Sequence, residues 1–148
     1  MKNSKVLEER IRRVKVLFKE LGYRIVGDEL VEGGFTAAFD NGSGIHGGFC
    51  IDEDSKFLEI GYTFSFSSSM AEYLKDRLEE MLKICYEFGC YINLEKSSSE
   101  FSFSLFSKTY FSGLNYFSLR DSLRDFKICI EQTTELLDIQ NEKPISED

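Results

Sequence analysis

The sequence predicts an α+β protein of element order α-β-β-β-α-β-β-α, with one twisted antiparallel sheet and helices packed against it. Residues 57–66 alternate apolar and polar side chains, which is the pattern of a half-buried strand. Other stretches repeat apolar residues every three or four positions, as amphipathic helices do. The remaining strand-like runs are separated by short turns typical of hairpins. Hairpin strands with polar outer faces favour one antiparallel sheet covered by helices on one face.

The N-terminal part begins with an amphipathic helix expected over residues 3–21. Gly22 marks its end, because glycine readily adopts the left-handed conformation that closes a helix. A short edge piece is expected within residues 23–31. Strands at 35–39 and 48–51 flank a glycine-rich turn and lead into the alternating strand. These segments predict a meander of three main strands.

The central helix is expected over residues 70–88 and carries a wide apolar stripe. Ser69 lies three residues before a glutamate, the spacing of a capping box, and Gly89 provides the stop. Alternating residues at 91–95 and 100–106 then predict a second hairpin.

A last amphipathic helix is expected from about Ser118 to Ile139, with Ser118 and Asp121 as its cap. The sequence shows no internal repeat and no linker between domains. Residues 1–139 are therefore expected to form a single α+β domain, and residues 140–148 a disordered polar tail.

The distribution of charge argues against nucleic acid as a partner. The net charge is −8, yet residues 1–21 hold seven Lys or Arg and three Asp or Glu, so the remaining chain is strongly acidic. Binding to a phosphate backbone needs a cationic surface, whereas one basic helix is more simply a solvated face. No apolar run is long enough for a signal core or a membrane span. A cytoplasmic location without membrane binding is expected.

No group of residues forms a recognisable catalytic pattern. His46 is the only histidine and lies in a glycine-rich turn between two strands, which favours a hairpin over a phosphate-binding loop. Acidic pairs such as Glu79 and Glu80 lie among basic residues on predicted helix surfaces. The sequence therefore predicts a protein that is not an enzyme and binds no cofactor.

The cysteines are expected to be buried, reduced thiols. They include no C-x-x-C pair and have no second histidine nearby, so neither a zinc site nor a redox motif is indicated. Three of them fall on apolar positions of predicted elements, where free cysteine behaves as a small hydrophobic residue. The four are Cys50, Cys85, Cys90 and Cys129.

Aromatic residues exceed what one sheet face needs, with fourteen Phe and seven Tyr. Several cluster between the last predicted strand and the last helix, namely Phe106, Tyr110, Phe111, Tyr116 and Phe117. Surplus apolar surface without a catalytic set is typical of a homodimer interface or a peptide-binding groove.

The element order, small size, acidic balance and closing segment Leu114-Asn-Tyr-Phe-Ser-Leu-Arg-Asp-Ser-Leu-Arg-Asp-Phe resemble the type III secretion chaperone-like fold. Class I effector chaperones and YbjN-like proteins share this fold. The resemblance covers residues 3–139. It implies an acidic homodimer without enzymatic activity, in which the central helix contributes to the dimer. It also implies that the first helix and the sheet hold an unfolded segment of a partner polypeptide, such as a secreted effector.

Carried onto this sequence, the resemblance implies two sets of residues. The candidates for the dimer interface flank the core stripe of the central helix and are Tyr73, Arg77, Ile84 and Tyr86. The candidates for partner binding are Val6, Val16 and Phe35. Two alternatives remain open. One is a YbjN-like regulatory or stress protein, and the other is a small-ligand-binding protein or enzyme that uses the sheet face, with a pocket near His46.

Overall fold

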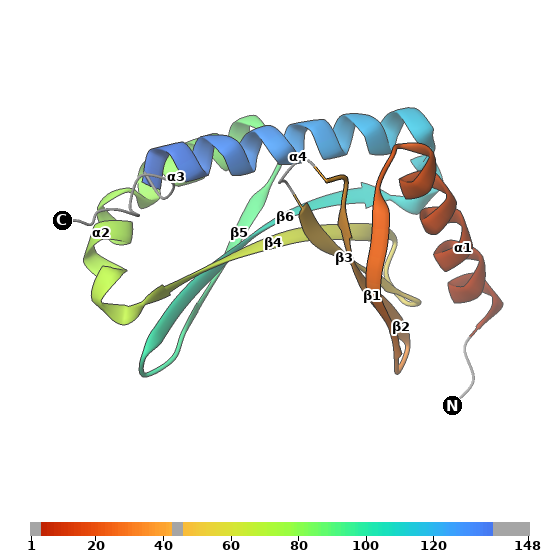
Figure 1. Cartoon of the computed structure of the whole chain (residues 1–148), viewed down its shortest axis with the longest axis horizontal. Helices are drawn as coiled ribbons and strands as arrows, with labels where there is room; N and C mark the ends of the chain where they lie inside the picture. The colour runs from red at the N-terminus through yellow and green to blue at the C-terminus, as the bar shows by residue number, and fades with distance from the viewer. Residues whose placement is uncertain (1–3, 43–45, 138–148) are drawn as a thin grey trace. The chain divides into compact units, whose positions relative to one another are not determined.

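A computed structural model describes residues 4–42 and 46–137 of the chain (Figure 1). The α-helices within these residues are α1 (Lys5–Glu20), α2 (Ala71–Asp76), α3 (Leu78–Glu87) and α4 (Tyr116–Leu137). The strands are β1 (Arg24–Val31), β2 (Gly34–Asp40), β3 (His46–Asp52), β4 (Phe57–Ser67), β5 (Tyr91–Lys96) and β6 (Glu100–Tyr110). They form one antiparallel sheet in the order β1-β2-β3-β4-β6-β5. The predicted α+β class is confirmed.

The contacts between residues divide the chain into two compact units. Unit 1 comprises the described residues of Met1–Tyr62 and Ser107–Arg124, and unit 2 those of Thr63–Phe106 and Asp125–Asp148. Each unit buries its own set of apolar side chains. The organisation of residues 1–139 as one domain stays a prediction, and the expected polar tail at 140–148 lies outside the described residues.

Helix α1 begins and ends as its sequence predicts. The Ser4 hydroxyl caps the first turn by accepting a hydrogen bond of 3.0 Å from the backbone N–H of Leu7. Gly22, with φ of +92°, follows the last turn in the left-handed conformation. Leu7, Val14 and Phe18 on one face of the helix are fully buried. The apolar stripe therefore packs into unit 1 while the charged face stays exposed.

The core of unit 1 is built on aromatic stacking between α1 and the sheet. The Phe18 ring centre lies 4.8 Å from that of Phe39 on β2 and 4.9 Å from that of Phe49 on β3. Figure 1 shows α1 beside the β1–β3 strands, in agreement with the contacts of α1 with β1 and β3. Strand β1, expected as a short edge piece, is a full strand at the outer edge of the sheet.

In unit 2, the predicted central helix is divided at Arg77. The N–H of Arg77 donates to the carbonyl of Leu74 rather than to that of Tyr73, which would accept it in a regular α-helix. The Arg77 guanidinium donates to the Tyr73 carbonyl instead, at 2.9 Å. The predicted cap is also wrong, because Met70 occupies the N-cap position of α2 and the Ser69 hydroxyl bonds to Ser67 at 2.7 Å.

The predicted hairpin and last helix are observed, with one correction at a cap. Gly89, with φ of +71°, ends α3 as predicted, and β5 pairs with β6. Helix α4 is capped by Asn115, whose side-chain oxygen accepts a 2.8 Å bond from the N–H of Ser118. The Ser118 hydroxyl in turn accepts a 2.9 Å bond from the Asn115 N–H. Ser118 thus supports the cap from the first turn, and Asp121 pairs with Arg124.

Candidate functional site

A shallow groove of about 440 Å³ lies in unit 1 between α1 and β1, and we call it the α1–β1 groove. Apolar side chains from both elements contribute to it. Val16 is 48% exposed and Leu30 is 56% exposed, so neither is covered within the described chain. The lining residues are Glu8, Ile11, Arg12, Lys15, Val16 and Leu30. The groove is an apolar strip with charged walls.

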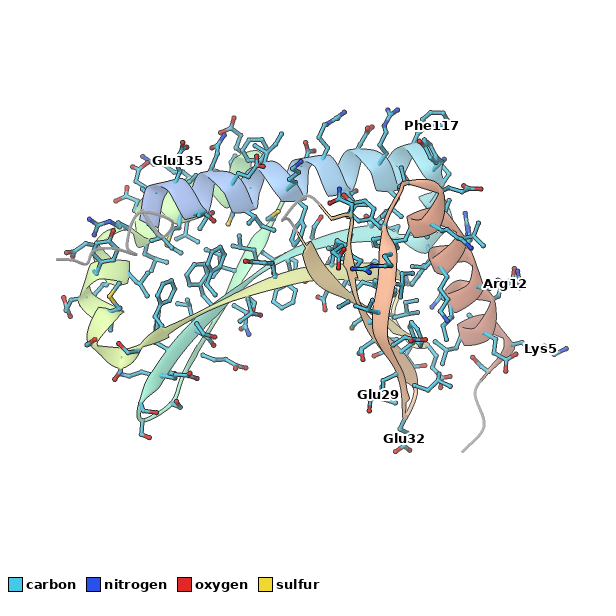
Figure 2. The ribbon with its side chains drawn as sticks, in the orientation of Figure 1. Lys5, Arg12, Glu29, Glu32, Phe117 and Glu135 are labelled. Carbon is cyan, nitrogen blue, oxygen red and sulfur yellow. The ribbon has the colours of Figure 1, made fainter. Side chains whose placement is uncertain are left out.

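Two of the three charged residues that line this groove, Arg12 and Lys15, are paired with neighbouring side chains. Arg12 forms an ion pair with Glu9, and the Lys15 ammonium lies 3.4 Å from a carboxylate oxygen of Asp28. Figure 2 shows Arg12 on α1 and the Glu29 and Glu32 side chains at the end of β1. Because the positive charges of Arg12 and Lys15 are balanced by nearby carboxylates, the groove suits an uncharged apolar segment better than a polyanion.

Two further arginines of α1 contribute to the structure of unit 1. Arg10 donates to the carbonyl of Ser55 at 2.7 Å, and Arg13 donates to the carbonyls of Phe111 and Leu114. The Arg10 guanidinium carbon also lies 4.2 Å from the Phe111 ring centre. These contacts use part of the positive charge of α1 inside the unit.

The outer edge of β1 is irregular, which bears on how a partner could bind. The register between β1 and β2 shifts between Val26 and Glu29, and Gly27 lies there with φ of +61°. A bulge in an edge strand twists its hydrogen-bonding groups out of line and disfavours pairing with an added strand. A partner at this edge is therefore better held by side chains in the α1–β1 groove.

A second depression, of about 330 Å³, lies in unit 2, and we call it the α3–β6 cavity. Its buried wall is apolar, since Leu74, Met81 and Phe103 are each at most 2% exposed. The Phe103 ring stacks on Phe64 at 4.8 Å, which fixes the floor. The lining residues are Ala71, Glu72, Leu74, Lys75, Leu78, Met81, Leu94, Lys96, Phe101 and Phe103.

Neither depression carries a set of groups arranged for catalysis. The charged residues of the α3–β6 cavity, Glu72, Lys75 and Lys96, are all exposed. Among the described residues, no group of three or more His, Cys, Asp or Glu could hold a metal ion. The alternative of a pocket near His46 falls on a side chain outside the described part of the chain. What the two depressions offer is apolar contact area with charged margins.

The four candidates for the dimer interface, all in unit 2, differ in whether their side chains make contacts within the unit or are exposed. Tyr73 donates its hydroxyl to the carbonyl of Leu137 at 2.8 Å, and Arg77 lies over the Tyr73 ring with its guanidinium carbon 3.6 Å from the ring centre. Ile84 is half-buried on α3. Tyr86 is 90% exposed, and Leu82, one turn earlier, is 50% exposed. The free apolar surface of α3 is therefore at Leu82 and Tyr86.

The three candidates for partner binding are not brought together. Val16 lines the α1–β1 groove, whereas Val6 is 53% exposed on α1 but is not among the groove residues. Phe35 is only 4% exposed and packs against Phe49 in the core of unit 1. The residue that sequence reasoning missed is Leu30, because its exposure depends on β1 being the edge strand.

Comparison with known proteins finds a similar solved structure but no match in sequence. No protein family and no curated protein matches the chain in sequence. The chain resembles the crystal structure of an uncharacterized protein from Methanothermobacter thermautotrophicus, with a TM-score of 0.69 and 14% identity. The match covers 87% of this chain and 96% of the archaeal chain. This likeness shows a shared fold. Within the part of the chain that the structure describes, no helix is long and apolar enough to cross a membrane.

Proposed function

We propose that this protein is a non-enzymatic binding module that holds an apolar segment of a partner polypeptide in the α1–β1 groove. The observation that carries the proposal is that Val16 and Leu30 are about half exposed on opposite walls of one groove. Apolar surface of this kind, flanked by charges, is typical of sites for protein partners. The resemblance to secretion chaperones, which use the same helix and the sheet, supports the proposal.

The chemistry of the groove indicates what the partner segment contains. Its walls offer aliphatic contacts from Ile11, Val16 and Leu30. Its two basic residues, Arg12 and Lys15, are paired with neighbouring carboxylates. An extended segment with spaced aliphatic side chains would bury this surface while both basic side chains keep their partners. A segment rich in acidic or basic residues would gain little here.

A homodimer is the second part of the proposal. The exposed apolar side chains of Leu82 and Tyr86 lie one turn apart on α3, so they form a continuous strip. Tyrosine is enriched in protein interfaces because it offers a large rigid surface at low entropic cost. The resemblance to the secretion chaperones, whose central helix contributes to the dimer, supports this placement.

The test of partner binding uses two synthetic peptides labelled with fluorescein. One carries leucine at alternate positions, and the other carries serine at the same positions. Fluorescence anisotropy is expected to show binding of the leucine peptide and a loss of affinity of about tenfold or more in Leu30→Glu, since burying a leucine is worth about 1.5–3 kcal/mol. Equal binding of both peptides, or unchanged affinity in Leu30→Glu, would reject the proposal.

A second candidate function is the binding of a small amphipathic acid in the α3–β6 cavity. Two lysines, Lys75 and Lys96, lie among the lining residues of an otherwise mainly apolar depression. An acyl chain would contact Met81 and Phe103 while its carboxylate lies near an ammonium group. Calorimetric titration with dodecanoate tests this candidate. Binding that weakens in Lys75→Met with Lys96→Met would support it, and absence of heat would remove it.

A further inference from the structure

Three of the four cysteines converge inside unit 2, although they are far apart in sequence. Cys129 on α4 and Cys85 on α3 have their sulfur atoms 4.0 Å apart. Cys90 lies in the short connection between α3 and β5, and its N–H donates to the carbonyl of Cys85 at 2.8 Å. The exposed fractions are 2% for Cys85, 9% for Cys90 and 0% for Cys129. We call these residues the thiol cluster.

The three sulfur atoms are not equivalent. The neutral Cys129 thiol donates to the Cys85 sulfur, and the Cys90 thiol donates to the carbonyl of Phe88 at 3.7 Å. The interactions of Cys129 with Cys85 and Cys90 favour its thiolate and lower the pKa of Cys129. The interaction with Cys129, together with burial, raises the pKa of Cys85 and of Cys90. The lowered pKa makes Cys129 the sulfur of the cluster that ionises first.

A buried hydroxyl beside Cys129 also favours the ionised form of this cysteine. Thr133 lies one helical turn further along α4, is 0% exposed, and its hydroxyl makes no hydrogen bond within the described residues. It nevertheless favours the ionised form of Cys129. A buried hydroxyl without a partner is unfavourable, so it would gain from a negative sulfur or a sulfur-bound oxygen next to it.

We propose that the thiol cluster is a site of reversible oxidation, at which a hydroperoxide converts Cys129 and Cys85 into a disulfide. The Cys129 thiolate attacks one peroxide oxygen, the O–O bond breaks, and the departing oxygen takes a proton to leave as water or an alcohol. Cys129 is then a sulfenic acid. The Cys85 sulfur, having lost its proton, attacks the Cys129 sulfur, and the S–O bond breaks to release water.

The geometry favours this pairing over others. A disulfide needs its sulfur atoms about 2 Å apart, so the Cys85 and Cys129 side chains, whose sulfur atoms lie 4.0 Å apart, must rotate toward each other. The second step is intramolecular, so it competes well with further oxidation of the sulfenic acid. Cys50 lies on β3 in unit 1 and belongs to no such cluster. The disulfide would join α3 to the unit 2 part of α4.

The experiment treats the full chain with hydrogen peroxide and maps the products by mass spectrometry. Cleavage after glutamate separates Cys85 from Cys90, because Glu87 lies between them. The expected product has lost two hydrogens, retains two of its four thiols, and contains a bond between Cys85 and Cys129 that dithiothreitol reverses. Cys50→Ala is expected to give the same product, and Cys129→Ala none.

Further measurements keep the test independent of how the variants fold. Peroxide treatment of the wild-type chain in denaturing urea should abolish the preference for the Cys85–Cys129 bond, because proximity is lost. Thr133→Val should slow the loss of the first thiol. Oxidation confined to Cys50, a disulfide between two copies, or oxygen added to Cys129 without a bond would overturn the proposal. A bond from Cys129 to Cys90 would overturn the assignment of Cys85.

Discussion

The guanidinium Nη1 of Arg10 donates to the carbonyl oxygen of Ser55 at 2.7 Å, and so joins α1 to the turn between β3 and β4. The same guanidinium lies over the Phe111 ring. A residue that the sequence places on a solvated basic face is therefore a structural contact of unit 1. Two of the six basic residues of α1, Arg10 and Arg13, thus attach the helix to the rest of unit 1.

We predict that Arg10→Gln lowers the free energy of unfolding by about 1–3 kcal/mol, since it removes a charge-assisted hydrogen bond and a cation–π contact. The matched control is Arg12→Gln, because Arg12 is exposed and pairs only with Glu9 among the described contacts. That change should cost less than about 1 kcal/mol. Urea denaturation followed by circular dichroism measures both. Equal losses would contradict this role of Arg10.

Local patterns account for the parts of the fold that the sequence predicted well. The apolar stripe of α1, the Gly22 and Gly89 stops and the alternation in β4 depend on neighbouring residues, which a sequence displays directly. The break at Arg77 was missed because the apolar stripe continues through it. The break is visible only in the structure, where the Arg77 N–H donates to the Leu74 carbonyl and the Arg77 side chain donates to the Tyr73 carbonyl.

We predict that Tyr73→Phe destabilises unit 2 by about 1 kcal/mol, the typical net value of a partly buried hydrogen bond. The Tyr73 hydroxyl donates to the carbonyl of Leu137 at the end of α4, and phenylalanine cannot replace that donor. Tyr86→Phe is the control, because Tyr86 is 90% exposed. Urea midpoints with unchanged slopes should differ between the two variants. If both variants matched the wild type, the Tyr73 bond would be of no consequence for stability.

We predict that Gly89→Ala costs about 1–2 kcal/mol, because Gly89 has φ of +71° and a Cβ disfavours the left-handed conformation. The space around it is open, so the cost comes from the backbone rather than from a clash. Gly113→Ala is the control, since Gly113 has no positive φ and equally open surroundings. Thermal unfolding should show a lower midpoint for the first variant alone. An unchanged midpoint would mean that the loop relaxes without cost.

We predict that the wild-type chain sediments as a dimer at micromolar concentration and that Tyr86→Glu yields a monomer. A charge placed in the strip formed by Leu82 and Tyr86 would lose its hydration in the interface. Tyr110→Glu is the control, because Tyr110 is 62% exposed but lies on β6 in unit 1. Sedimentation equilibrium measures the mass. A monomeric wild-type chain would contradict the proposed homodimer.

The candidate sites depend on contacts between distant segments, which is why the sequence predicted them only in part. Val16 is a sequence-based candidate because the resemblance to the secretion chaperones implies that the first helix binds a partner. Leu30, on the opposite wall of the groove, was not identified, because its exposure follows from the strand order. Likewise, no spacing motif links Cys85, Cys90 and Cys129, since the packing of α4 against α3 brings them together.

The most direct test of partner binding compares Val16→Glu with Val6→Glu. The two valines lie on the same helix and are 48% and 53% exposed, but only Val16 lines the α1–β1 groove. Titration of the fluorescein-labelled leucine peptide should show affinity reduced by about tenfold or more in Val16→Glu, which corresponds to about 1.4 kcal/mol, and unchanged in Val6→Glu. Equal affinities of the two variants would contradict the assignment of this groove as the site that holds a partner polypeptide.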